Sequence, residues 1–231
     1  METMGRLCTI AVLVGGCNFA LPGAEPAAGG DGSVPPADDA SVDTSPGVDM
    51  APPPPGATTT DHVASADTWL HSQLPDTNFS GDRVVIPDGN PVAIALMQFD
   101  LTPLAGTHVA QVELHIFTDF DPGAEVQVFP LTEAWSETQA TFNQRANGLA
   151  WTTPGAAPPS RGTTAIATFT PAPEFTQFVV AVDPATVAAW IATPSANFGF
   201  AITSVNSDGP KLVSREGAAG TRPFLRITHT P

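Results

Sequence analysis

The sequence predicts an all-β domain, an antiparallel β-sandwich or jelly roll with one short helix. Short runs of alternating apolar and polar residues recur from about residue 64 onward. Clusters of Pro, Asp, Gly and Asn separate these runs. Many short strands at such spacing are typical of β-sandwiches. The expected strands are 67–71, 83–86, 93–99, 111–116, 125–128, 164–169, 175–182, 197–202 and 223–228.

One helix is predicted directly after Asp183. Asp183 can cap its amino terminus, and Pro184 suits the first helical position. Val187, Trp190 and Ile191 lie three and four residues apart, which places them on one helical face. We expect that face, with Trp190, to pack on the core of the sandwich.

The composition limits the possible classes of function. The 231 residues include 8 Lys+Arg and 23 Asp+Glu, a net charge of −15. A chain this acidic repels phosphate backbones, so no nucleic acid partner is expected. Both cysteines, Cys8 and Cys17, lie near the amino terminus. The domain is therefore expected to have no disulfide and no cysteine-based zinc site.

Residues 1–17 are typical of a lipoprotein signal peptide. Arg6 gives a small positive region, and 7–14 form an apolar run too short to span a bilayer. The run ends in Val-Gly-Gly-Cys, which resembles a bacterial lipobox with Cys17 as the lipidated residue. An ordinary secretory signal cleaved near Ala20 or Ala24 is the alternative. Either way the protein is expected to be exported, to the outer membrane or cell surface if lipidated and otherwise to the extracellular space.

Residues 18–60 are predicted to be a disordered linker. Pro, Gly, Ala, Ser and Asp dominate this segment, and a run of prolines lies at 52–55. The segment has too few aliphatic residues to form a core, and the proline run favours an extended conformation. It would tether the folded domain, residues 61–231, to the membrane through the lipid anchor. The domain is expected to be a monomer.

Residues 131–144 are too polar for a core strand and too aromatic for a plain surface loop. They are predicted to form an ordered loop in which Trp135 and Phe142 pack inward. The side chains of Glu133, Glu137 and Asn143 would make local hydrogen bonds.

Several segments of the domain resemble the DNRLRE-domain family, and they occur in the family's order. Residues 66–70 and 75–79 resemble its opening strand and the turn that follows. Residues 132–144 resemble its Trp- and Asn-containing loop, and 197–200 resemble a late strand. Further similar segments lie at 97–101, 112–116, 187–190, 214–216 and 222–225.

The resemblance extends from about Ala64 to Thr228, with departures at Ser80, Gln98 and Arg145. This family is grouped with carbohydrate-binding module family 96 and includes disaggregatase-related proteins. The resemblance implies a β-sandwich of secreted or surface proteins, with a polysaccharide as the expected partner.

An exposed aromatic ring beside polar groups is the expected sign of a sugar site, because pyranose C–H faces stack on rings. Trp135 and Trp190 are expected in the core. Trp151 follows a stretch rich in small residues and is the preferred exposed platform. Trp69, in the first expected strand, is the second carbohydrate-binding candidate. The alternative role for Trp151 is packing within its own loop.

Asp67, Asp76 and Asn78 are the candidate metal ligands. Their oxygens could converge on a structural calcium ion, which prefers oxygen ligands. The alternative is that Asp67 and Asn78 cap turns at the edge of the sandwich. No other cofactor is expected.

No catalytic set is predicted. Glu133 and Glu137 are the nearest pair of carboxylates, but hydrogen bonding within their loop is the simpler role. The five histidines have no metal or triad spacing, and His115 is expected at the surface. Arg215 and Glu216 are expected to form a structural ion pair.

The favoured hypothesis is a non-catalytic polysaccharide-binding module held at the cell surface. A structural or adhesion module of the envelope, with a protein partner, is the alternative. A polysaccharide lyase or hydrolase ranks last, because no catalytic set is predicted.

Overall fold

The long first strand, β1 (Thr58–His71), is shared by two sheets. Its first half pairs with β13 (Phe224–Thr230), and its second half pairs with β4 (Val92–Phe99). The partner changes between Val63 and Ala64. A shift of register between Ala64 and Ala66 follows directly, and an irregularity of this kind bends a strand and increases its twist. One strand thereby holds both layers of the fold together.

The computed structural model describes residues 52–119, 123–171 and 173–231. The predicted signal peptide with Cys17, and the predicted linker as far as residue 51, lie outside the described residues. Residues 58–60 were expected in the linker, but they form the start of β1. No helix of the described ranges is long and apolar enough to cross a membrane.

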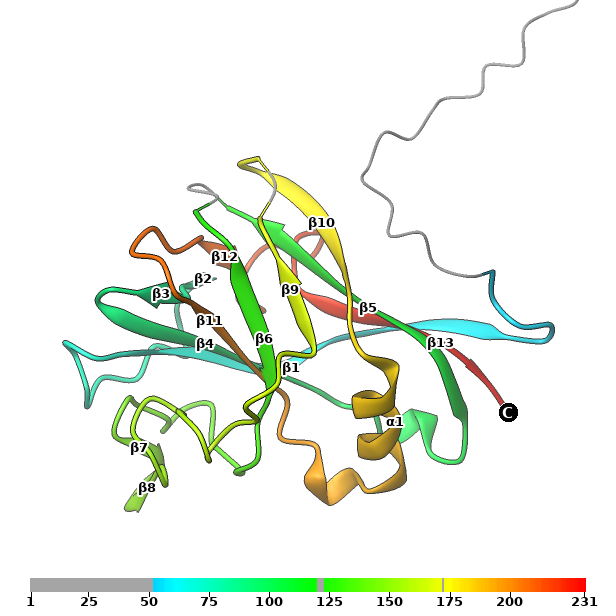
Figure 1. Ribbon diagram of the computed structural model, residues 1–231, viewed down its shortest axis with the longest axis horizontal. Coiled ribbons are helices and arrows are strands. Elements are labelled where there is room, and N and C mark those ends of the chain that lie inside the picture. The colour runs from blue at the N-terminus through cyan, green and yellow to red at the C-terminus, as the bar shows by residue number, and fades with distance from the viewer. Residues whose placement is uncertain (1–51, 120–122, 172) are drawn as a thin grey trace, which may run out of the picture. The chain divides into compact units, whose positions relative to one another are not determined.

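Two antiparallel sheets form a β-sandwich, as predicted (Figure 1). The other strands of the sandwich are β2 (Val84–Val85), β3 (Asp88–Gly89), β5 (His108–Thr118), β6 (Val126–Pro130), β9 (Ala167–Phe169), β10 (Thr176–Ala181), β11 (Phe200–Ser204) and β12 (Leu212–Val213). The first sheet has the order β2, β12, β5, β13, β1, and β10 also pairs with β5. The second has the order β1, β4, β11, β6, β9, and β3 also pairs with β4.

The predicted helix is present as α1 (Pro184–Ala192). The Asp183 carboxylate accepts a backbone N–H of the first turn and so caps the helix. Trp190 is buried, and its ring centroid lies 5.1 Å from that of Phe200 in the core, as predicted. The other helical segments of the described residues are two short 3₁₀ turns, Thr102–Leu104 and Pro194–Ala196.

The main core lies between the two sheets. Alternate residues of facing strands supply it, such as Ala95 and Met97 from β4, and Leu114 and Ile116 from β5. This alternation is what the sequence pattern predicted, because successive side chains of a strand point to opposite faces.

A second apolar cluster covers the outer face of the second sheet. After β6, residues 131–161 form a long segment, here called the cover loop, whose ends meet at a bridge between Leu131 and Arg161. The loop contains a hairpin of β7 (Gln144–Ala146) and β8 (Leu149–Ala150), which Figure 1 shows away from the two main sheets. Its residues Leu131, Ala140, Trp151 and Ala156 pack with Leu70, Ile94, Leu96 and Ala201 of the sheet.

The cover loop explains the composition of β4. Residues 93–97 of this strand are all buried, although strands with one solvated face alternate. Ala95 and Met97 face the main core, whereas Ile94 and Leu96 face the cover loop. The unbroken apolar run in the sequence therefore reports a strand that is covered on both sides.

Gly199 is required where the chain enters β11. Its φ is +81°, and an added Cβ would overlap the carbonyl oxygen of Met97 in the neighbouring strand. Both the left-handed backbone and the close approach of the strand exclude a side chain.

We predict that Gly199→Ala destabilises the protein by about 2–3 kcal/mol, from backbone strain and displacement of β4. Urea unfolding curves would measure the change. Gly220→Ala is the matched control, because open space surrounds Gly220 and its φ is not positive. Equal unfolding free energies for the two variants would contradict the prediction.

Candidate functional site

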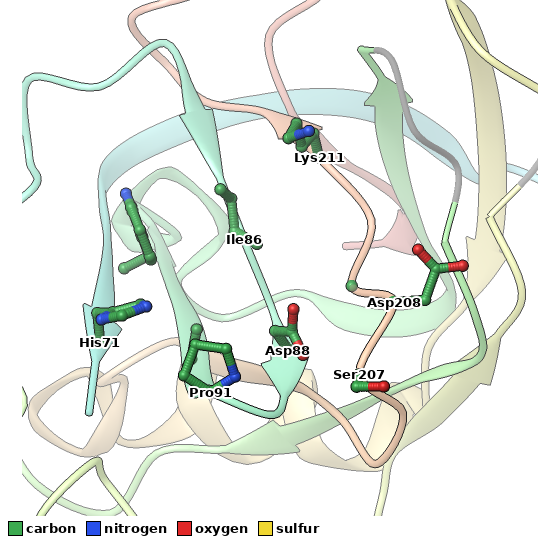
Figure 2. A pocket seen from close by; sticks show the side chains of 10 residues that line it. His71, Ile86, Asp88, Pro91, Ser207, Asp208 and Lys211 are labelled. Carbon is green, nitrogen blue, oxygen red and sulfur yellow. The ribbon is translucent and has the colours of Figure 1, made fainter. Parts of the chain in front are cut away.

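A pocket of about 270 Å³ opens beside Trp69. Trp69 and His71 lie two apart on β1 and therefore project from the same face. Trp69 also packs against the core between the sheets. The segment 86–93, which contains β3 and the start of β4, and residues 207–211 complete the walls (Figure 2).

The Trp69 ring is fixed by its neighbours. Phe79 stacks on it with ring centroids 4.2 Å apart and an angle of 27° between the planes. The indole N–H donates to Asp82 Oδ2 at 3.0 Å, and the edge of His71 meets the ring at a centroid distance of 5.5 Å. Phe79 and Asp82 both belong to the loop after β1. The ring is half-buried and oriented before any ligand arrives.

Polar groups surround the rest of the pocket. In Figure 2, His71 lies on one side, Asp208 and Lys211 lie on the other, and Asp88 lies between them. Asp88 Oδ1 accepts the Asn90 N–H at 2.9 Å, which orients its carboxylate. An aromatic ring beside carboxylates and an ammonium group can offer a stacking surface and hydrogen-bond partners to a polyhydroxylated ligand.

Trp151, the preferred exposed platform, was predicted wrongly. Only 3% of its surface is exposed, and its indole N–H donates to Thr141 O at 2.9 Å within the cover loop. The ring packs in the cluster that covers the second sheet. The small residues around it allow close packing of the loop, so the alternative role is the correct one. Trp135 and Phe142 pack against the same cluster, as predicted.

Asp67 lies at the centre of a charged cluster rather than a turn. Its side chain is buried, and carboxylate oxygens of Asp67, Glu137 and Glu216 lie within 4.8 Å of one another. Arg215 Nε lies 2.9 Å from Glu216 and 3.3 Å from Glu137, which confirms the predicted Arg215–Glu216 pair. The guanidinium thus places positive charge among these carboxylates.

Burial raises the pKa of Asp67 to about 8. The nearby carboxylates of Glu216 and Glu137 add to the rise, because a second negative charge is unfavourable beside them. The Arg215 backbone N–H, which donates to Asp67 Oδ2 at 2.6 Å, opposes it. At neutral pH the protonated form of Asp67 is therefore favoured.

The predicted metal ligands are not grouped as expected. Around Asp67 the structure places Glu137 and Glu216 instead of Asp76 and Asn78. Asp76 accepts a hydrogen bond from Asn143, and the Asn78 amide donates to the Glu137 and Ala140 carbonyl oxygens. Both side chains thus fasten the loop after β1 to the cover loop. The calcium ion itself stays a prediction.

The carboxylates of the cover loop have structural partners. Glu137 Oε1 accepts the Asp67 N–H at 3.0 Å, and Glu133 Oε2 lies 3.7 Å from Arg145 Nε. These contacts confirm local bonding of Glu133 and Glu137. His115 was expected at the surface, but Phe224 stacks on its ring and leaves 5% of the residue exposed.

Residues 58–229 match the profile of Carbohydrate-binding module family 96. The chain belongs to that family. No curated protein matches the sequence. The resemblance found on short segments of the sequence is therefore confirmed over the whole sandwich, and carbohydrate is the kind of ligand that the family binds.

Within this family 96 module, the sequence singled out Trp69 as the second candidate platform, but not the groups that form the pocket beside it. Phe79 was noted only as a family match, and Asp82, Asp88 and Asp208 were not singled out. The alternation of residues in β1 was the sequence signal that could have found His71, because residues two apart on a strand, such as Trp69 and His71, project from the same face of the sheet. Residues 207–211 come from a distant turn, and only the fold brings them to the pocket.

We predict that Asp67→Asn flattens the dependence of stability on pH. A pKa raised from 3.8 to about 8 means that the native state binds this proton more tightly than the unfolded chain. The stabilisation is complete below pH 3.8 and is lost as the pH rises through about 8. The wild-type protein should lose free energy of unfolding, on the order of a few kcal/mol, across that window.

Urea unfolding at pH 5 and pH 9 would measure this difference for both proteins. Asn keeps an oxygen for the Arg215 N–H and cannot ionise, so the variant should lose less stability between the two pH values. Equal losses in the two proteins would refute the assignment.

Proposed function

We propose that this module binds a polysaccharide without cleaving it, and that the pocket beside Trp69 is the binding site. The observation that carries the proposal is the half-buried Trp69 ring, backed by Phe79 and held by Asp82 at the wall of a polar pocket. Family membership supports carbohydrate as the ligand.

The fixed orientation of the Trp69 ring lowers the free-energy cost of binding a sugar. Ordering a mobile side chain costs free energy on association, and Trp69 is already held by its hydrogen bond to Asp82. A pyranose ring can stack on the exposed part of the indole while its hydroxyls meet Asp88, Ser207 and Asp208. The pocket is open to solvent, and its volume of about 270 Å³ suits one or two residues of a longer chain.

The absence of cleavage is proposed from the roles of the carboxylates. Among the described residues, Glu133, Glu137 and Glu216 make ion pairs or backbone contacts that hold the fold. A glycosidase needs one carboxyl group to act as acid and a second as base or nucleophile, both facing the sugar. These three carboxylates are instead directed at arginines, and the pocket carboxylates Asp88 and Asp208 are proposed to accept hydrogen bonds from sugar hydroxyls.

We predict that Trp69→Ala strongly weakens polysaccharide binding, because it removes the stacking surface, whereas Trp69→Phe retains part of it. Affinity electrophoresis of the full chain against neutral and acidic polysaccharides would identify a bound polymer. Isothermal titration of that polymer would then compare the variants. A rise in Kd of about a hundredfold is expected for Trp69→Ala.

Trp69 also contacts the core, so a second variant separates binding from folding. Asp208 is exposed at the pocket wall, and Asp208→Ala should weaken binding several-fold with an unchanged melting temperature. Leu149→Ala, on the cover loop, removes an exposed apolar side chain and should change neither. Full binding by Trp69→Ala would refute the site, and no retardation by any polymer would favour an adhesion role.

We also propose that the module is exported and anchored by a lipid on Cys17, through the predicted linker that precedes β1. The proposal rests on the apolar run and the Val-Gly-Gly-Cys sequence. In the cell, Cys17→Ser should move the protein from the membrane fraction to the soluble fraction, and Cys8→Ser is the matched control. A soluble wild-type protein would favour the ordinary secretory signal.

A further inference from the structure

A second concavity lies on the outer face of the second sheet, next to the cover loop. It has a volume of about 380 Å³ and is bounded by β4, β6 and β11 on one side and by residues 142–161 on the other. Phe129 and Phe142 line it, with the exposed side chains of Val92 and Val205. This groove, here called the outer groove, exists because the cover loop does not cover the whole face of the sheet.

Gly155 and Phe142 form the wall that the cover loop contributes. Gly155 has a φ of +69°, and an added Cβ would lie 2.6 Å from the Phe142 ring. The Gly155 N–H donates to Phe142 O at 2.7 Å. The aromatic wall is therefore packed directly on backbone and is not free to close the groove.

Arg161 is the notable charged group of the outer groove. Its guanidinium carbon lies 4.3 Å from the centroid of Phe129, over the ring face. The side chain is half-buried, and its Nε has no hydrogen-bond partner. None of the salt bridges found between described residues involves Arg161, although the chain has a net charge of −15.

An unpaired, partly buried guanidinium is unusual, because buried charges are normally paired. Burial lowers the pKa of Arg161, yet arginine stays protonated in proteins. Stacking on Phe129 offsets part of the desolvation cost and fixes the plane of the guanidinium. Because Nε is itself shielded from solvent, the terminal N–H groups of Arg161 are the donors left for an acceptor that enters the groove.

We propose that the outer groove is a second ligand site, in which Arg161 binds an anionic group on a polysaccharide, either a sulfate ester or a carboxylate. A planar fork of N–H donors matches the oxygens of such groups and can bind two of them at once. Gln127 and Thr203 line the same groove and can contact neighbouring hydroxyls. The site rests on the proposed polysaccharide binding for the kind of ligand, but it does not depend on Trp69.

The charges around the outer groove favour an anionic group at one position, beside Arg161. Asp88 lines both the outer groove and the Trp69 pocket. Its carboxylate would repel an anion at the end of the groove that it borders, which leaves Arg161 as the favourable position. The Trp69 pocket has two carboxylates, Asp88 and Asp208, beside Lys211, whereas the outer groove has Asp88 beside Arg161, so the two concavities differ in charge.

Three polymers with one backbone test the proposal: dextran, carboxymethyl dextran and dextran sulfate. Isothermal titration would measure their binding to the full chain. We expect at least one charged polymer to bind more tightly than dextran. Arg161→Gln should raise its Kd about ten- to a hundredfold, since hydrogen bonds to charged groups are lost. Arg161→Lys should restore part of the affinity, because it keeps the charge without the fork.

Two further variants keep the result interpretable. Gln127→Glu adds a carboxylate to the groove without altering Arg161, and it should weaken the charged polymer by a similar factor. Arg226→Gln makes the same change of charge on the other sheet, where Arg226 pairs with Asp61 at 2.8 Å. It should leave the Kd unchanged within about twofold, because exposed charges are screened over about 10 Å.

The polymer that binds identifies the anionic group that the outer groove accepts. Binding of dextran sulfate alone identifies a sulfate site, binding of carboxymethyl dextran alone identifies a carboxylate site, and both together identify a general anion site. Charged polymers that bind no better than dextran would overturn the proposal, as would unchanged binding by Arg161→Gln. If Trp69→Ala loses a neutral polymer but still binds the charged polymer, and Arg161→Gln weakens that remaining binding, the two sites are separate.

Discussion

The contacts of Asp67 hold together three segments that are far apart in the sequence. Its carboxylate accepts the Arg215 N–H after β12, and its own N–H donates to Glu137 of the cover loop. Arg215 in turn bridges Glu137 and Glu216. Trp69 lies two residues further along the same strand, so the position of the proposed sugar platform depends on this buried cluster. Substitutions there would disturb binding through geometry, without contact to the ligand.

The four tryptophans divide into scaffold and site by what their polar atoms contact. The indole N–H groups of Trp135 and Trp151 donate to backbone carbonyls, and Trp190 is packed against the core. Trp69 donates instead to an Asp82 carboxylate and keeps part of its ring at a pocket. A backbone acceptor fixes a ring inside the fold, whereas a carboxylate near solvent holds a ring at the surface.

How far the sequence could predict this structure differs between the fold and the site. The alternation of 111–116 and the cap at Asp183 are local signals, and both elements were correctly predicted. The burial of Trp151 was not, because its cover depends on packing of the cover loop against β4 and β11. The predicted grouping of Asp67 with Asp76 and Asn78 was wrong for the same reason. Asp76 and Asn78 are near Asp67 in sequence, whereas Glu137 and Glu216 approach it only through long-range contacts. Composition could suggest that the apolar run in β4 was covered, but not what covers it.

The charge of the whole chain bears on how the outer groove would select its ligand. A net charge of −15 opposes the approach of any polyanion, and this repulsion weakens beyond about 8 Å in physiological salt. Attraction begins only where an anionic group meets Arg161 directly, with Phe129 behind the guanidinium. Long-range steering therefore contributes nothing to affinity here, and a polyanion that cannot place a group at Arg161 is repelled. The outer groove would therefore select a polyanion by where its anionic group lies relative to Arg161, and not by the total charge of the polymer.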